Sequence, residues 1–139
     1  MKPPIVSNES PNPQVSGDLS VYDSVEWAQK AHEPYVADDP MFRLYDSEGR
    51  LLKMRADWDG YRSVIEPAEE APTHLEQLTS VVKDFLVRTS APAELLDRPL
   101  GEMIAYIYER DPNPSSGYRP PGKARGGAWQ AVLRLFRRR

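Results

Sequence analysis

Residues 41–54 read MFRLYDSEGRLLKM and contain the clearest β-hairpin pattern in the chain. Asp46 occupies the first position of a type I turn and Gly49 the fourth. A glycine in a left-handed conformation at that place closes a three-residue hairpin loop. The turn therefore brings Asp46 opposite Arg50 and joins two antiparallel strands.

The pairing register of the hairpin follows from this turn. It places Leu44 opposite Leu52 and Phe42 opposite Met54. Because side chains alternate along a strand, these four apolar residues share one face. Turn chemistry and apolar pattern thus predict the same register independently. The other face is mixed and is predicted to be partly solvated; it holds Met41, Tyr45, Leu51 and Arg55.

One further strand and two helices complete the predicted domain. Residues 61–66 are expected to form a third strand, which Pro67 ends. Residues 73–88 begin with a capping signal and then place apolar residues at helical spacing, and residues 99–110 repeat that spacing. We therefore expect an α+β fold, a three-stranded antiparallel sheet covered on its apolar hairpin face by these two helices.

The segments before the hairpin are less regular. Residues 1–20 hold four prolines among polar residues, and such a segment buries too little apolar surface to offset its ordering entropy. We predict a disordered N-terminal tail there, followed by a small α+β domain over residues 21–110. Residues 21–32 fit a short helix capped near Asp23, or a strand through residues 20–27, and we favour the helix.

The C-terminal part of the chain differs from the rest in composition. Residues 111–127 are rich in Pro and Gly and are predicted to be a linker. Residues 128–139 regain helical spacing and end in arginines, so a basic amphipathic helix is predicted. The candidate partner-binding residues of this helix are Trp129, Val132, Leu133, Arg134, Phe136, Arg137, Arg138 and Arg139.

The net charge of −3 conceals an asymmetry along the chain. Residues 1–110 hold 20 acidic and 11 basic side chains, a net charge of −9, whereas residues 111–139 carry a net charge of +6. An acidic body is suited to a basic partner. The candidate acidic surface consists of Asp38, Asp39, Asp57, Asp59, Glu69 and Glu70.

No catalytic, cofactor-binding or metal-binding residues are assigned from the sequence, and no cofactor is expected. The chain has no cysteine, which excludes disulfides and thiol chemistry. His32 and His74 lie in different segments without metal-ligand spacing. Residues 55–66 resemble part of a calcium-binding loop, but Arg55 occupies the position where the first oxygen ligand is required. No Ser-His-Asp pattern or phosphate-binding glycine loop is present.

These observations favour a non-enzymatic protein-binding module whose acidic body engages a basic protein partner. Immunity, antitoxin and adaptor proteins are similar in size and charge only. One alternative is a weak contact of residues 124–139 with a membrane surface or a nucleic acid. Another is an enzyme whose site lacks a linear motif. The sequence has no membrane-spanning run or secretory signal, so a cytoplasmic location is expected.

Overall fold

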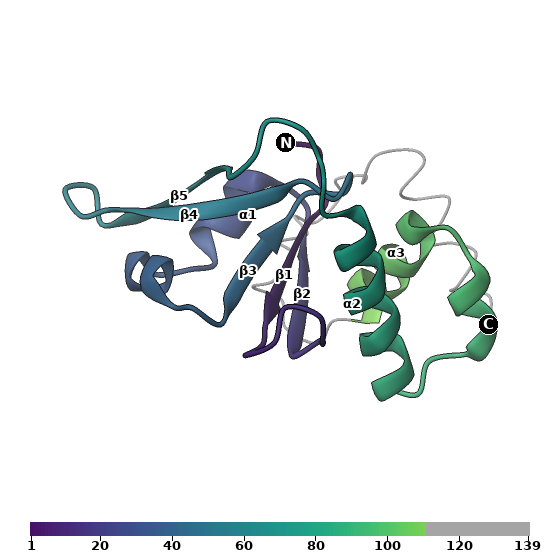
Figure 1. Cartoon of the computed structure of the whole chain (residues 1–139). Coiled ribbons are helices and arrows are strands. Elements are labelled where there is room, and N and C mark those ends of the chain that lie inside the picture. The colour runs from purple at the N-terminus through teal and green to yellow at the C-terminus, as the bar shows by residue number, and fades with distance from the viewer. Residues whose placement is uncertain (111–139) are drawn as a thin grey trace, which may run out of the picture.

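The computed structural model describes residues 1–110, which form a five-stranded antiparallel sheet with helices on both of its faces (Figure 1). The strand order is β2-β1-β3-β4-β5. The strands are β1 (Ile5–Glu9), β2 (Asp18–Tyr22), β3 (Phe42–Tyr45), β4 (Leu51–Asp57) and β5 (Arg62–Pro67). The helices are α1 (Val25–Lys30), α2 (Leu75–Arg88) and α3 (Leu100–Arg110), with 3-10 segments η1 (Pro34–Asp38) and η2 (Ala93–Asp97).

The predictions of a three-stranded sheet and of a disordered N-terminal tail are wrong. β1 lies inside the sheet, between β2 and β3, and its residues Ile5 to Asn8 are fully or almost fully buried. Side-chain hydrogen bonds hold the proline-containing loop that follows. The amide of Asn8 donates to the carbonyl oxygen of Val15 (3.2 Å) and accepts from the backbone N–H of Gly17 (2.8 Å). Such contacts leave no periodic pattern in the sequence.

The hairpin prediction is confirmed at its turn. Leu44 pairs with Leu52, the backbone N–H of Asp46 donates to the carbonyl oxygen of Arg50 (3.0 Å), and Gly49 has a φ of +83°. The ladder between β3 and β4 ends at the Leu44–Leu52 pair, however, so the predicted pairing of Phe42 with Met54 is not formed.

The predicted placement of the two long helices on the apolar hairpin face is also wrong. That face packs instead against α1, through a cluster that contains Leu44, Leu52 and Ala28. α2 and α3 cover the opposite face, where Tyr45 is fully buried and Leu51 packs against the same core. The reason is that β1 and β2 contribute apolar residues to both faces of the sheet.

Residues 21–32 combine the two predicted alternatives, because the segment starts as a strand and continues as a helix. β2 continues to Tyr22, and α1 begins only after Ser24, whose side chain accepts from the backbone N–H of Trp27 (3.1 Å). Ser24, not Asp23, is therefore the helix cap. The predicted linker over residues 111–127 and the predicted basic helix over residues 128–139 lie outside the described residues. Within residues 1–110, every helix is too short or too polar to cross a bilayer.

Candidate functional site

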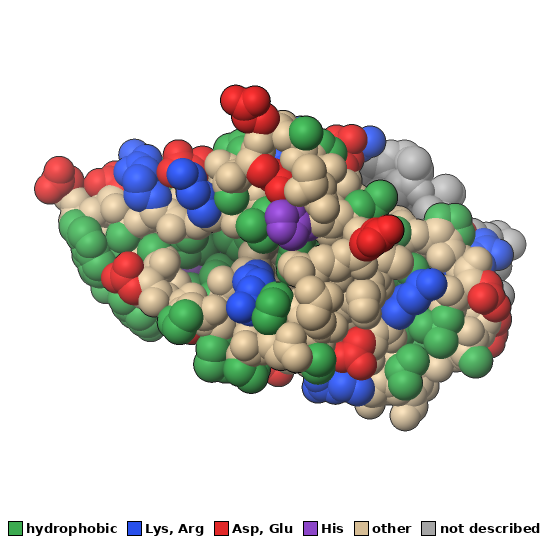
Figure 2. All heavy atoms as spheres, in the orientation of Figure 1, with side chains coloured by type: hydrophobic (Ala, Val, Ile, Leu, Met, Phe, Trp, Pro, Cys, Tyr) green, Lys and Arg blue, Asp and Glu red, His purple; other side chains and the backbone are tan. Residues whose placement is uncertain are grey.

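A cleft of about 450 Å³ opens where β3 and β4 separate. The two strands pair at only two positions, whereas β4 and β5 pair at six, and β3 turns away from β4 in Figure 1. Figure 2 shows a hollow between the β4–β5 hairpin and η1 in which hydrophobic side chains are visible. Its lining includes Phe42, Leu44, Leu52 and Met54 of the two strands and Val36 of η1. The early end of the β3–β4 ladder thus creates a concave, largely apolar site.

Two cationic side chains, Arg43 and Lys53, also line this cleft. Both adjoin the Leu44–Leu52 pair at which the ladder ends, and strand alternation places both on the α2 face of the sheet. Arg43 donates to the carbonyl oxygen of Ser10 (2.8 Å), and neither cation has an ion-pair partner within residues 1–110. Asp39 is the acidic side chain in the lining, and it accepts from the backbone N–H of Met41 (2.9 Å).

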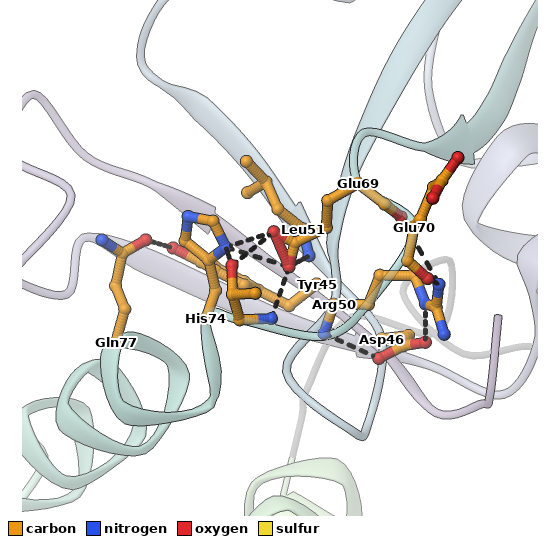
Figure 3. A network of polar contacts seen from close by, with 9 residues as sticks. Tyr45, Asp46, Arg50, Leu51, Glu69, Glu70, His74 and Gln77 are labelled. Carbon is orange, nitrogen blue, oxygen red and sulfur yellow. Dashed lines mark hydrogen bonds and ion pairs between the residues drawn. The ribbon is translucent and has the colours of Figure 1, made fainter.

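A polar network borders the cleft at the start of α2 (Figure 3). The Glu69 carboxylate accepts from the backbone N–H and the hydroxyl of Thr73 (2.7 and 2.8 Å) and from the backbone N–H of Leu51 (3.3 Å). It also lies 2.7 Å from Nδ1 of His74. Because a carboxylate only accepts, Nδ1 of His74 carries the proton in this contact. The network fixes the loop between β5 and α2.

The pKa of Glu69 reflects this environment. Desolvation is the largest single effect and raises the pKa, but the hydrogen bonds from Thr73, Leu51 and His74 together lower it to about 2. Glu69 is therefore ionised at neutral pH, with its oxygens engaged by neighbouring donors. It is not a carboxylate free to bind a partner.

Asp46 forms the second half of the network in Figure 3 and is fully buried. One carboxylate oxygen accepts from the backbone N–H groups of Glu48 (2.9 Å) and Arg50 (3.0 Å). The other accepts from the backbone N–H of Lys2 (3.1 Å) and lies 3.6 Å from Nε of Arg50. The hairpin turn is thereby tied to the N-terminal residues.

The His74–Glu69 contact has the geometry of a base oriented by a carboxylate, but the described part of the chain places no nucleophile beside it. Within residues 1–110, no hydroxyl is hydrogen-bonded to Nε2 of His74, and no group of three or more metal-ligating side chains is placed to hold an ion. His32 lies between Tyr22 and Phe42, and desolvation lowers its pKa. Its Nδ1 is 2.7 Å from the carbonyl oxygen of Ala28. The contacts of both histidines are thus explained by a structural role.

An exposed group of aromatic side chains, here named the aromatic tip, consists of Tyr35, Trp58 and Tyr61. Their exposed fractions are 62%, 57% and 61%. Trp58 and Tyr61 belong to the turn between β4 and β5, with ring centroids 6.2 Å apart. η1 packs against both β4 and β5, and the charge of Glu33, which precedes η1, is the largest cause of the raised pKa of Tyr61. Figure 2 shows hydrophobic side chains gathered over this end of the molecule, with both acidic and basic side chains at its margin.

The backbone of the aromatic tip is strained at Tyr61. Its φ is +48°, in the left-handed region that favours glycine. Gly60 precedes it and would suit that conformation, yet the left-handed residue is the tyrosine. Strain of this kind is concentrated at functional sites in proteins.

The predicted acidic surface is divided by the structure. Asp57 is paired with Arg62 (2.8 Å), Asp39 lines the cleft and Glu69 is held in the polar network. The exposed members are Asp38, Asp59 and Glu70. The predicted partner-binding residues from Trp129 to Arg139 lie outside the described part of the chain, so that prediction is not tested.

Sequence reasoning did not single out the aromatic tip or the two cations of the cleft. Trp58 and Tyr61 flank a turn, where a large aromatic side chain has no core to enter, and this is a signal that could have identified them. Arg43 and Lys53 carried no signal, because the separation of β3 from β4 depends on segments distant in the sequence. No protein-family model matches the chain, and no curated protein or solved structure is significantly similar to it.

Proposed function

We propose that the protein is a binding module that contacts a basic protein partner through the aromatic tip. The observation that carries this proposal is the exposure of Tyr35, Trp58 and Tyr61 at one end of the molecule. Tryptophan and tyrosine are enriched among the residues that dominate binding energies at protein interfaces. Their large, stiff rings bury much area on binding and lose little conformational entropy.

The charge around the aromatic tip supports a basic partner. Asp38 and Asp59 are exposed beside it, Glu33 lies near Tyr61, and residues 1–110 carry a net charge of −9. A negative margin around an aromatic centre steers a positively charged surface toward the site and accelerates association. The strained φ of Tyr61 also supports a functional role, because a glycine there would be easier to accommodate.

The test is affinity capture from an extract of the source organism, with the intact chain as bait. The double variant Trp58→Ser/Tyr61→Ser should lose a captured basic protein, with affinity reduced by about 30-fold or more if the tip is a hot spot. Val87→Ser is the matched control, because Val87 is equally exposed (61%) but lies on α2. The affinity of the captured protein should also fall as salt is raised.

Two results would contradict the proposal. One is equal capture by the wild type and by the double variant, after circular dichroism has shown that both are folded. The other is a captured partner with an acidic contact surface, whose affinity rises with salt.

A further inference from the structure

The cleft between β3 and β4 has a property beyond the proposed function, namely the free edge of β4 at Met54. Met54 is opposite Ile65 in β5, and the backbone N–H of Ile65 points outward to Oε1 of Gln29 (2.8 Å). In an antiparallel ladder, opposed residues either exchange both backbone hydrogen bonds or neither. The Met54–Ile65 pair is therefore not hydrogen-bonded, and the N–H and C=O of Met54 point toward β3.

β3 does not use this edge. Its ladder with β4 ends at Leu44–Leu52, and the backbone N–H of Phe42 donates instead to the carbonyl oxygen of Asp39 (3.2 Å). Among the described residues, Met54 thus has no ladder partner on this side, although it lines a cleft with an apolar interior. An unpaired strand edge is a template for the addition of an extended chain.

The chemistry of the cleft indicates what the added chain would carry. Arg43 and Lys53 line it without ion-pair partners in residues 1–110. The partly exposed Phe42 and Met54 supply an apolar wall, to which the nearly buried Leu44 and Leu52 contribute little surface. Asp39 is outnumbered by the two cations and already accepts a backbone hydrogen bond. A carboxylate directly beside an apolar side chain satisfies both features, since guanidinium and ammonium groups form strong charge-assisted hydrogen bonds to carboxylates.

We propose that this cleft binds the C-terminal end of an extended peptide, with its terminal carboxylate at Arg43 and Lys53 and its last, apolar side chain inside the cleft. The peptide backbone pairs with the free N–H and C=O of Met54. A fatty acid could supply the carboxylate and the apolar group, but it would leave both backbone groups of Met54 unpaired. The volume of about 450 Å³ is within the range of small ligand sites and suits one or two residues.

The test uses four fluorescein-labelled pentapeptides that end in Leu, Val, Ile or Phe, each prepared with a free carboxylate and as the C-terminal amide. Fluorescence anisotropy with the intact protein should show binding of at least one free acid and a loss of about tenfold or more for its amide. N-methylation of the amide that pairs with Met54 should abolish binding. The Met54 amide resonance should shift in a ¹⁵N-labelled sample.

The matched pair of variants is Lys53→Gln and Lys83→Gln. Both lysines are exposed, but Lys53 lines the cleft whereas Lys83 lies on α2 outside it. Lys53→Gln should lower the affinity for the free-acid peptide by about threefold to tenfold and leave the affinity for the amide peptide unchanged. Lys83→Gln should change neither affinity. The proposal is overturned if no free acid binds, if amide and acid bind equally, or if decanoate competes while the N-methylated peptide still binds. None of these outcomes bears on Trp58 or Tyr61.

Discussion

Gly49 in the hairpin turn lies directly against Leu75, the first residue of α2. A Cβ atom added at position 49 would lie 2.3 Å from Cα of Leu75 and 2.5 Å from its backbone nitrogen. The carbonyl oxygen of Gly49 accepts from the backbone N–H of His74 (2.8 Å). The turn that closes the hairpin is thus also the surface on which α2 begins, and this contact joins the sheet to the helical layer.

Gly49→Val should be among the most destabilising single substitutions in the protein. The φ of +83° costs a β-branched residue ~1–2 kcal/mol, and the contact with the backbone of Leu75 adds ~1–3 kcal/mol of overpacking. Urea denaturation with a conserved slope measures the change. Gly101→Ala is the control, because no atom of residues 1–110 lies within 4 Å of an added Cβ there, and it should stabilise α3 by ~0.5–1 kcal/mol. An unchanged midpoint for Gly49→Val would contradict the turn geometry.

Asp46→Asn should destabilise the fold despite its nearly identical shape. In one orientation the amide nitrogen would face the backbone N–H groups of Glu48 and Arg50. In the other it would face the backbone N–H of Lys2, and the ion-pair contact with Nε of Arg50 (3.6 Å) would also be lost. A buried N–H group that faces the new amide nitrogen loses its hydrogen-bond acceptor, which costs ~1–3 kcal/mol for each hydrogen bond lost. The thermal midpoint and the denaturation midpoint should both fall. Asp59→Asn, at an exposed aspartate in the β4–β5 turn, should leave both midpoints unchanged and serves as the comparison.

Ionisation of Glu69 should make the free energy of unfolding depend on pH in the acidic range. Its pKa is about 2 in the folded protein, against an ordinary value of 4.5. A lowered pKa means that the unfolded chain binds the proton more tightly, so this stabilisation is complete above pH 4.5 and is lost as the pH falls toward 2. The stability difference between wild type and Glu69→Gln should therefore shrink between pH 5 and pH 2.5. Glu70→Gln is the control, since only the backbone carbonyl of Glu70 joins the network.

Local chemistry explains which parts of this fold the sequence could predict. The Asp46–Gly49 turn, the Leu44–Leu52 register and the apolar stripes of α2 and α3 each depend on residues close together in the chain, and the structure contains all of them. A period or a turn signal is enough to identify such elements.

The remainder of the fold depends on contacts between distant segments. β1 and β2 are short, with two or three apolar residues each, and they are stable because helices bury both faces of the sheet. The mixed composition of the strand face that holds Tyr45 predicts that this face is partly solvated, but the Tyr45 hydroxyl donates to Oε1 of Gln77 (2.5 Å) and the ring is buried. The cleft could not be predicted, since it results from the divergence of two strands that the turn chemistry alone would keep paired.

A single substitution at the strained Tyr61 should change stability and binding in opposite directions. Tyr61→Gly removes the cost of a left-handed tyrosine at φ +48° and should stabilise the protein by up to ~1 kcal/mol. It also removes one ring of the aromatic tip, so capture of the basic partner should weaken. Ser90→Gly is the matched control, because Ser90 has a φ of +58° at the end of α2, far from the tip in sequence.

Both glycine variants should therefore raise the denaturation midpoint, and only Tyr61→Gly should reduce capture. A protein that keeps a strained aromatic residue where glycine is more stable is expected to use the side chain, because most stabilising changes elsewhere leave function intact. If Tyr61→Gly raises stability and leaves capture unchanged, the ring at position 61 has no role in binding, and the interface must be sought away from the β4–β5 turn. If it lowers stability while Ser90→Gly raises it, contacts of the Tyr61 side chain outweigh the strain, and the positive φ is no indication of function.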